Sequence, residues 1–304
     1  MYYFQWTLVG LLFAFSSMAQ PTQAYEFTAP HMGTQFRVVL YAADSASARH
    51  AADQAFARVS YLNQLLSDYL EDSELNRLSA TAGTGSPVPV SNELWTVLHF
   101  AQTISNATDG AFDVTIGTLS KLWRKAFRQQ VFPSKAEIEQ ARFKVGYQHL
   151  LLDANNQTVA LKRTGTRLDL GAIAKGFAVD EAMKAMEQQG ISHALVDGGG
   201  DLLLKNDPAV SHSWHIAIQN GKTLPLANCA IATSGKQYKF LEHKGKRYSH
   251  LIDPRTGMGV THERQITIIA DTAMKADALA SACSVLSKAQ AKRLARSHER
   301  QNLC

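Results

Sequence analysis

The stretch from Leu168 to Asp180 constrains the fold more than any other, because its pattern changes from strand to helix within a few residues. Leu168-Asp-Leu170 predicts the end of a β-strand. A helix that ends at Gly190 is predicted by the apolar repeat of Ala178, Ala182, Met183 and Met186. Between them, Gly171-Ala-Ile-Ala-Lys-Gly176 leaves backbone N–H groups and carbonyls free near a helix start. Such a junction suits an anion or its metal ion, although the spacing is not that of a P-loop. Taken alone, it is also the pattern of an ordinary turn with a surface lysine.

Three later segments add carboxylates and hydroxyls where the chain turns. The first, 194–201, predicts a short buried strand that ends in a glycine-rich turn between Asp197 and Asp201. The second, 247–257, places four polar side chains around one tight turn: His250, Asp253, Arg255 and Thr256.

The third segment follows a predicted strand at 266–270 and begins a helix. On this helix Asp277 and Ser281 stand four residues apart, so both oxygens project from one face. Completed by a carbonyl from elsewhere, the pair forms the kind of oxygen site that magnesium prefers. The same pair is also typical of a solvated helix face or a helix cap.

With these segments in view, the chain resembles the FAD:protein FMN transferase family, flavin-transferring proteins once called thiamine-biosynthesis lipoproteins. The resemblance spans roughly residues 30 to 290. It is carried, in order along the chain, by Met32-Gly-Thr34, Ser73-Glu-Leu-Asn76, Gly110–Gly117, Leu168–Gly176, Val196–Asp201, Ala232-Thr-Ser-Gly235, Ser249–Gly257 and Ala276–Ser281. No single motif decides it; their number and order do.

The resemblance implies a magnesium-dependent reaction with FAD as substrate. A threonine hydroxyl of a target protein attacks the FMN-side phosphorus, AMP leaves, and the flavin is held by a phosphoester bond. Positioning and charge neutralisation do most of the catalysis in such a phosphoryl transfer. Two alternatives use the same site: an FAD pyrophosphatase that gives FMN and AMP, and a non-catalytic flavin-binding protein.

The resemblance also implies residue roles. The family's metal ligands fall on the backbone of Ala172 and on Asp277 and Ser281, with Ala280 adjacent; the family usually has threonine where this chain has Ser281. Asp169 and Lys175 lie where the family contacts FAD. Further flavin or adenine contacts match Met32, Tyr69, Ala111, Phe112, Asp113 and Ile252.

Two residues of the tight turn are candidates for direct roles in the chemistry. His250 is the candidate to take the threonine proton, since its reference pKa lies near the working pH; the alternative is a structural histidine that orients the Asp253 turn. Arg255 is a candidate phosphate clamp, or simply faces water.

The N-terminus predicts export. Residues 1–25 carry no charged side chain, and 6–15 form an apolar run too short to span a bilayer. Small residues at Ser17-Met-Ala19 and Thr22-Gln-Ala24 offer cleavage sites. We expect a cleaved signal peptide at 1–24, a flavin transferase domain at 25–304 and a periplasmic protein. Because this segment has no cysteine, we expect no lipid anchor.

Composition narrows the partners. The formal charge of +5 suits an anionic cofactor and an acidic target segment, and the basic tail Lys288–Arg300 lacks the aromatic residues of a nucleic-acid surface. We therefore expect an acceptor redox protein with a target threonine, no nucleic acid, and membrane contact only through the acceptor. The three cysteines, Cys229, Cys283 and Cys304, are an odd number, so at least one free thiol is expected.

The elements predict an α+β fold in a single compact domain, with mixed sheets and helices packed around a flavin cleft. A strand is predicted at Gln35–Tyr41. Helices are predicted around Phe56–Tyr69, after the cap Ser91, after the capping box Ser134/Glu137, at Ala178–Gln189 and at Met274–Ser287. The resemblance implies that family members usually continue past this last helix into a closing strand pair, so we expect an edge strand that is unpaired or covered by a partner.

Overall fold

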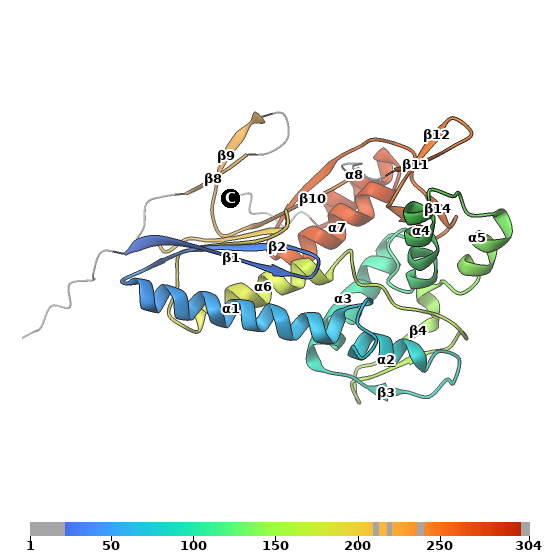
Figure 1. Ribbon diagram of the computed structural model, residues 1–304, viewed down its shortest axis with the longest axis horizontal. Coiled ribbons are helices and arrows are strands. Elements are labelled where there is room, and N and C mark those ends of the chain that lie inside the picture. The colour runs from blue at the N-terminus through green and yellow to red at the C-terminus, as the bar shows by residue number, and fades with distance from the viewer. Residues whose placement is uncertain (1–21, 209–212, 218–220, 236–239, 299–304) are drawn as a thin grey trace, which may run out of the picture.

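The computed structural model describes residues 22–208, 213–217, 221–235 and 240–298. Its centre is a six-stranded antiparallel sheet in the order β1-β2-β6-β7-β10-β15 (Figure 1). The strands are β1 (Gln23–His31), β2 (Thr34–Ala42), β6 (Ala194–Gly198), β7 (Leu202–Lys205), β10 (Ala230–Ser234) and β15 (Ile266–Ala270). Among the described residues β15 is an edge strand of this sheet.

Three helices pack together against the sheet: α1 (Ser45–Leu66), α6 (Ala174–Glu187) and α7 (Ala273–Val285) (Figure 1). Their buried faces are rich in alanine, which allows the helix axes to come close. The short helix α8 (Lys288–His298) follows α7 and buries Ala291 and Leu294. The large core therefore lies between these helices and the sheet.

The opposite face of the sheet carries a smaller cluster. Leu195, Leu204 and Ile231 pack there under a hairpin of β8 (Trp214–Ala217) and β9 (Thr223–Leu226). On this hairpin His215 of β8 is exposed.

The remaining elements form the region at the right of Figure 1. Its helices are α2 (Glu74–Ala80), α3 (Asn92–Ala107), α4 (Gly117–Gln129), α5 (Lys135–Arg142) and the 3₁₀ helix at Tyr147–His149. A three-stranded sheet of β3 (Val88–Pro89), β5 (Thr158–Leu161) and β4 (Leu150–Asp153) lies beside them. Two hairpins complete it: β11 (Phe240–His243) with β12 (Lys246–Ser249), and β13 (Ile252–Asp253) with β14 (Met258–Gly259).

The expected mixture of helices and sheets is confirmed, as are several local details. Ser91 caps α3 by accepting from the Leu94 N–H at 3.2 Å. Ser134 and Glu137 form the predicted capping box of α5. The strand expected at 266–270 is β15. In the described part of the chain, no helix combines the length and the apolar character needed to cross a membrane.

Two expectations were wrong. Leu168–Leu170 is not a β-strand, because its backbone N–H groups are used elsewhere: Leu168 donates to Ser79 Oγ at 3.0 Å and Asp169 donates to the Val114 carbonyl at 2.8 Å. Tyr69 does not continue the apolar face of α1, which ends at Leu66; its side chain is 73% exposed.

The predicted signal segment 1–24 lies almost entirely outside the described residues. Its last two residues, Gln23 and Ala24, begin β1 and pair with Ala42 and Tyr41 of β2.

Candidate active site

The first turns of α6 and α7 lie against each other. A Cβ on Gly176 would stand only 2.3 Å from the Ala273 carbonyl oxygen, so glycine is needed for the approach. Asp180 of α6 caps α7 by accepting from the N–H groups of Ala273 at 2.7 Å and Met274 at 2.9 Å. Burial raises the pKa of Asp180 to about 6, against the lowering effect of these two hydrogen bonds. Two helix starts, with their partial positive charge, are thereby fixed side by side.

Lys175 joins two buried carboxylates at this junction. Its ammonium forms an ion pair with Asp201 and lies 3.7 Å from Asp277 Oδ2. That oxygen also accepts from the Gly176 N–H at 3.2 Å. Burial alone would lower the pKa of Lys175, but the carboxylates of Asp277 and Asp201 raise it above its ordinary value. Burial and the charge of Asp277 raise the pKa of Asp201 to about 7.

The predicted metal ligands lie around the same junction. Asp277 is 5% exposed and Ser281 is partly buried one turn further along α7. Ala172 lies two residues before the start of α6. Among the described residues, no three His, Cys, Asp or Glu side chains gather as a metal cage. One buried carboxylate with a hydroxyl and a carbonyl is nevertheless a donor set that fits magnesium, which keeps waters and uses substrate phosphates as further ligands.

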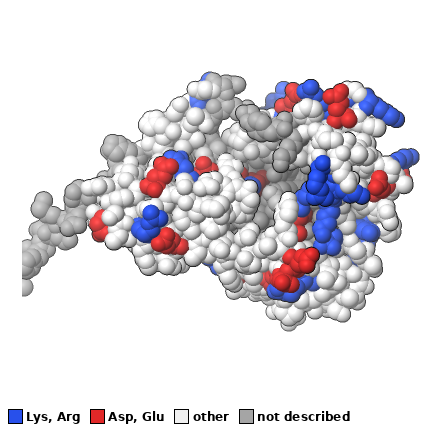
Figure 2. Space-filling view, viewed as in Figure 1, with Lys and Arg blue, Asp and Glu red and all other residues white. Residues whose placement is uncertain are grey.

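Arg124 of α4 connects two further carboxylates. It forms ion pairs with Asp68 and, at 2.9 Å, with Asp169 Oδ2. Its guanidinium carbon lies 4.4 Å from the centroid of the Tyr69 ring. Burial and the neighbouring charge of Asp169 raise the pKa of Asp68, while Arg124 opposes the rise. Lys and Arg side chains gather over α4 in Figure 2; this helix carries Lys121, Arg124, Lys125 and Arg128.

The loop after α3 is built around Asp113, which is 6% exposed. Its carboxylate accepts from Thr115 Oγ1 at 2.7 Å and from the Tyr147 N–H at 2.8 Å. Burial raises the pKa of Asp113 to about 6, although these hydrogen bonds act to lower it. The side chains of Ala111 and Phe112 are buried in the main core. A ligand would therefore meet these two residues through their backbone.

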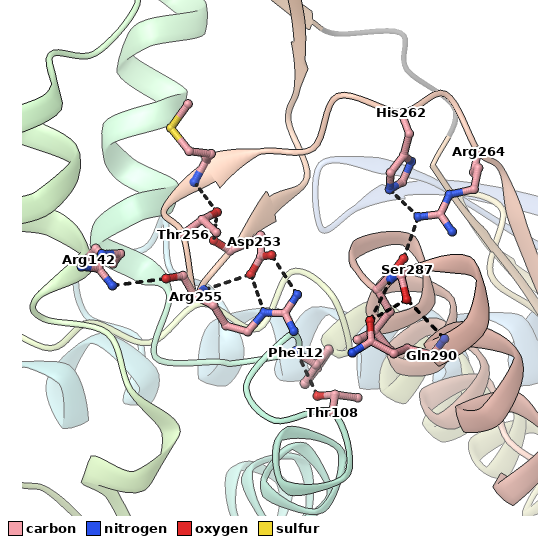
Figure 3. Close-up of polar contacts among 12 residues, drawn as sticks. Thr108, Phe112, Arg142, Asp253, Arg255, Thr256, His262, Arg264, Ser287 and Gln290 are labelled. Carbon is pink, nitrogen blue, oxygen red and sulfur yellow. Dashed lines mark hydrogen bonds and ion pairs between the residues drawn. The ribbon is translucent and has the colours of Figure 1, made fainter.

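The Asp253 turn uses its own arginine. Arg255 donates from Nε to Asp253 Oδ1 at 2.9 Å and from Nη2 to Oδ2 at 2.8 Å, a two-pronged ion pair (Figure 3). In the same view the pair lies close to the loop that begins at Thr108, and a Cβ on Gly110 would stand 4.0 Å from Arg255 Cγ. The guanidinium that the sequence offered as a phosphate clamp is thus already engaged by a carboxylate.

His250 lies on a firmly held backbone with its side chain exposed. On one side, the Ser249 N–H donates to the Val260 carbonyl at 2.9 Å; on the other, the Val260 N–H donates to the Leu251 carbonyl at 2.8 Å. Gly259 packs so closely that a Cβ there would stand 2.4 Å from the Ser249 carbonyl oxygen. Ile252 follows; it is partly buried and packs against a small apolar cluster of Trp123, Ala126 and Leu241.

Close approaches and one hydrogen bond connect each of these motifs to the next. The Asp253 turn lies beside Gly110, the loop after Gly110 bonds to Asp169 through Val114, and the chain runs from Asp169 directly to Lys175. The Met32–Thr34 turn lies against the glycine-rich turn before Asp201, because a Cβ on Gly199 would stand 2.4 Å from Thr34 Oγ1. A separate cavity of about 280 Å³, lined by Trp95, His99 and Gln102 among others, contains none of the predicted site residues.

A comparison against known families identifies the family of this chain. The model of the ApbE family matches residues 32–303. The chain belongs to the ApbE family.

Curated relatives and solved structures agree with this assignment. Proteins named FAD:protein FMN transferase include one from Haemophilus influenzae, 29% identical over 97% of this chain and 89% of its own length. Another, from Escherichia coli K12, is 32% identical over 87% of this chain and 79% of its own. The apo crystal structure of Pseudomonas stutzeri flavinyl transferase ApbE superposes with a TM-score of 0.81 at 29% identity, covering 92% of this chain and 90% of that one. The flavin transferase ApbE from Vibrio cholerae gives a TM-score of 0.79, also at 29% identity, with 91% of each chain covered.

Some residues of the site were not singled out from the sequence. Arg124 and Asp68 belong to a helix and a loop whose patterns mark them only as surface charges. Asp180 lies in the quoted helix, but its cap on α7 joins residues more than ninety positions apart. Asp201 was noted as the end of a glycine-rich turn, without Lys175 as its partner.

Proposed function

We propose that this chain transfers FMN from FAD to a threonine hydroxyl of a partner protein, with magnesium, and releases AMP. The observation that carries the proposal is the junction of α6 and α7, where Lys175, Asp201 and Asp277 meet beside two helix starts. A pyrophosphate needs positive charge around it, from cations and helix starts, and its metal ion needs a buried carboxylate. This junction supplies all of these.

The chain's own groups would divide the work in the following way. The Lys175 ammonium would bind the phosphates and neutralise their charge, helped by the partial positive charge of the two helix starts; the first N–H groups of α7 themselves donate to Asp180. The oxygen of the incoming threonine forms a bond to the FMN-side phosphorus. The bond between that phosphorus and the bridging oxygen breaks, and the oxygen leaves with AMP. His250 would take the threonine proton, since its imidazole is exposed on a rigid turn where an incoming protein can reach it.

Magnesium would be held by Asp277, the Ser281 hydroxyl and the Ala172 carbonyl, with Ala280 adjacent on the helix. Bound there, the cation would supply charge neutralisation on the departing AMP. Lys175 would hold Asp277 in a fixed orientation, because its ammonium lies between the carboxylates of Asp277 and Asp201.

The partner would be an exported or membrane-associated redox protein. Support comes from the uncharged, apolar stretch at the start of the chain, which is typical of a periplasmic protein with a cleaved signal peptide. Under this proposal the protein meets a membrane only through its acceptor.

The test is AMP release from FAD and magnesium, measured with and without a threonine-bearing acceptor. Acceptor-dependent release, with flavin covalently attached to the acceptor, supports the transferase. Equal release without acceptor would identify an FAD pyrophosphatase, and binding of FAD with no AMP in either case would identify a non-catalytic flavin-binding protein.

A further inference from the structure

Arg124 combines two kinds of contact in one side chain, ion pairs and an aromatic ring. Its two terminal nitrogens engage the carboxylates of Asp68 and Asp169, whose side chains are only 10% and 9% exposed. The plane of the same guanidinium lies over the Tyr69 ring, 4.4 Å from its centroid. The two carboxylates therefore fix the guanidinium, and the guanidinium in turn holds the ring.

The ring that Arg124 holds presents much of its surface to solvent. Tyr69 is 73% exposed, the most exposed large hydrophobic side chain of the described residues. An exposed aromatic ring held by a fixed cation is a flat surface that is already ordered, so a planar ligand ring would stack on it at a small cost in entropy.

The cluster is continuous with the proposed FAD site. Asp169 accepts from the Gly171 N–H at 2.9 Å and so shapes the turn that leads to Ala172 and Lys175. Arg124 consequently links the Tyr69 ring to the backbone that would bind the pyrophosphate and its metal ion.

We propose that Arg124 is a positioning residue that holds the Tyr69 ring as a stacking platform for a planar ring of FAD. This inference rests on the proposed function, because it takes FAD as the ligand and Tyr69 as one of the contacts that the family resemblance implies; what it adds is the role of Arg124. Arg124 itself does not take part in the transfer; it acts through Tyr69.

The chain contains a matched control for the ion pairs. Arg58 also bridges two carboxylates, Glu93 and Glu181, and lies 5.3 Å from the centroid of the Tyr61 ring. Neither carboxylate belongs to the site, so the loss of Arg58 reports only the structural effect of removing such an arginine. What distinguishes Arg124 is its bond to Asp169.

The experiment is a fluorescence titration of the mature protein with FAD, in magnesium and without acceptor, with AMP measured at the end of each titration. Arg124→Gln and Tyr69→Ala are each expected to weaken FAD binding about tenfold, the size of one lost stacking contact. Because they remove the same platform, the double variant should bind no more weakly than the worse single one. Tyr69→Phe keeps the ring and should bind FAD more tightly than Tyr69→Ala, whereas Arg58→Gln should stay within about twofold of wild type.

Arg124→Lys tests whether the planar guanidinium, and not only its positive charge, holds the Tyr69 ring. It keeps a cation for the carboxylates but loses the planar face, so we expect near-wild-type thermal stability with weakened FAD binding. Wild-type affinity in Arg124→Lys, or in Tyr69→Ala, would overturn the proposal even if Arg124→Gln does not fold. The proposal would also be overturned if the losses of FAD affinity in Arg124→Gln and Tyr69→Ala multiplied in the double variant. A wild-type protein that binds no FAD would overturn it as well.

The proposed function fails independently of this inference. Wild-type protein that binds FAD through Tyr69 and Arg124, yet transfers no flavin to any acceptor, would refute the transferase and leave the platform standing. A protein that transfers flavin, but whose FAD affinity is unchanged in these variants, would support the transferase and refute the stacking platform.

Discussion

Replacing Gly176 with alanine tests whether the close packing of α6 on α7 builds the site. The added Cβ would stand 2.3 Å from the Ala273 carbonyl oxygen and 2.8 Å from the Met274 nitrogen, both backbone atoms that cannot rotate away. The helices would have to separate by about 1 Å to restore ordinary contact, and overpacking against backbone atoms costs about 2–3 kcal/mol, the upper part of the usual range. Alanine recovers about 1 kcal/mol through helix propensity, which leaves a net loss of about 1–2 kcal/mol.

The assay is thermal unfolding followed by circular dichroism, with FAD-dependent AMP release measured in parallel. A loss of this size lowers Tm by about 2–8 °C in a chain of this length. The rate of AMP release should fall by more than the loss of folded protein accounts for, because the Gly176 N–H also orients Asp277. The control is Gly171→Ala in the same segment, where the nearest atom to the new Cβ is a movable side-chain oxygen, Asp169 Oδ1, at 3.1 Å. If Gly176→Ala melts at or above the wild-type temperature, the proposed packing constraint is wrong.

Three further outcomes are expected. Burial raises the pKa of Asp180 to about 6, so the stability of the wild-type protein relative to Asp180→Asn should be highest below about pH 4. This difference should fall by about 3 kcal/mol as the pH rises through about 6. Urea unfolding of both proteins across about pH 4–8 measures the difference, and a difference that does not change with pH would contradict the prediction. Asp277→Asn should lower magnesium affinity in the presence of FAD at least about tenfold by calorimetry, whereas Asp271→Asn, an exposed acid just before the same helix, should leave it unchanged. Trp123→Phe should cost about 2–3 kcal/mol in chemical denaturation, because Nε1 donates to the buried Gly257 carbonyl at 2.8 Å; a loss below about 0.5 kcal/mol would show that this bond does not anchor α4.

Local signals in the sequence were enough for many elements. The caps at Ser91 and Ser134 are decided by side chains within three residues, and β15 by a short apolar run between turns. The same local reasoning failed at Leu168–Leu170, which has a strand-like composition. There the backbone donors bond to Ser79 and Val114, partners that no local pattern reveals.

The residues of the candidate site also differ in how far the sequence could predict them. The ordered motifs named Asp169, Lys175 and Asp277, because a family resemblance carries over residue by residue. Arg124 could not be found in this way, since its meaning depends on two carboxylates brought together from 45 and 56 positions away. Arg255 illustrates the converse: its residue type suits a phosphate, but Asp253, two residues before it, takes up its guanidinium.

The most direct test of the account follows covalent flavin on an acceptor. The wild-type protein and its Asp277→Asn variant are incubated with FAD, magnesium and a threonine-bearing acceptor, and the denatured acceptor is then examined for flavin fluorescence and intact mass. We predict one FMN on the acceptor with the wild-type protein, and none with the variant or when the threonine is replaced by alanine. Flavin attached equally by Asp277→Asn, or FAD bound by the wild-type protein without any labelled acceptor, would contradict the proposed transfer at the α6–α7 junction.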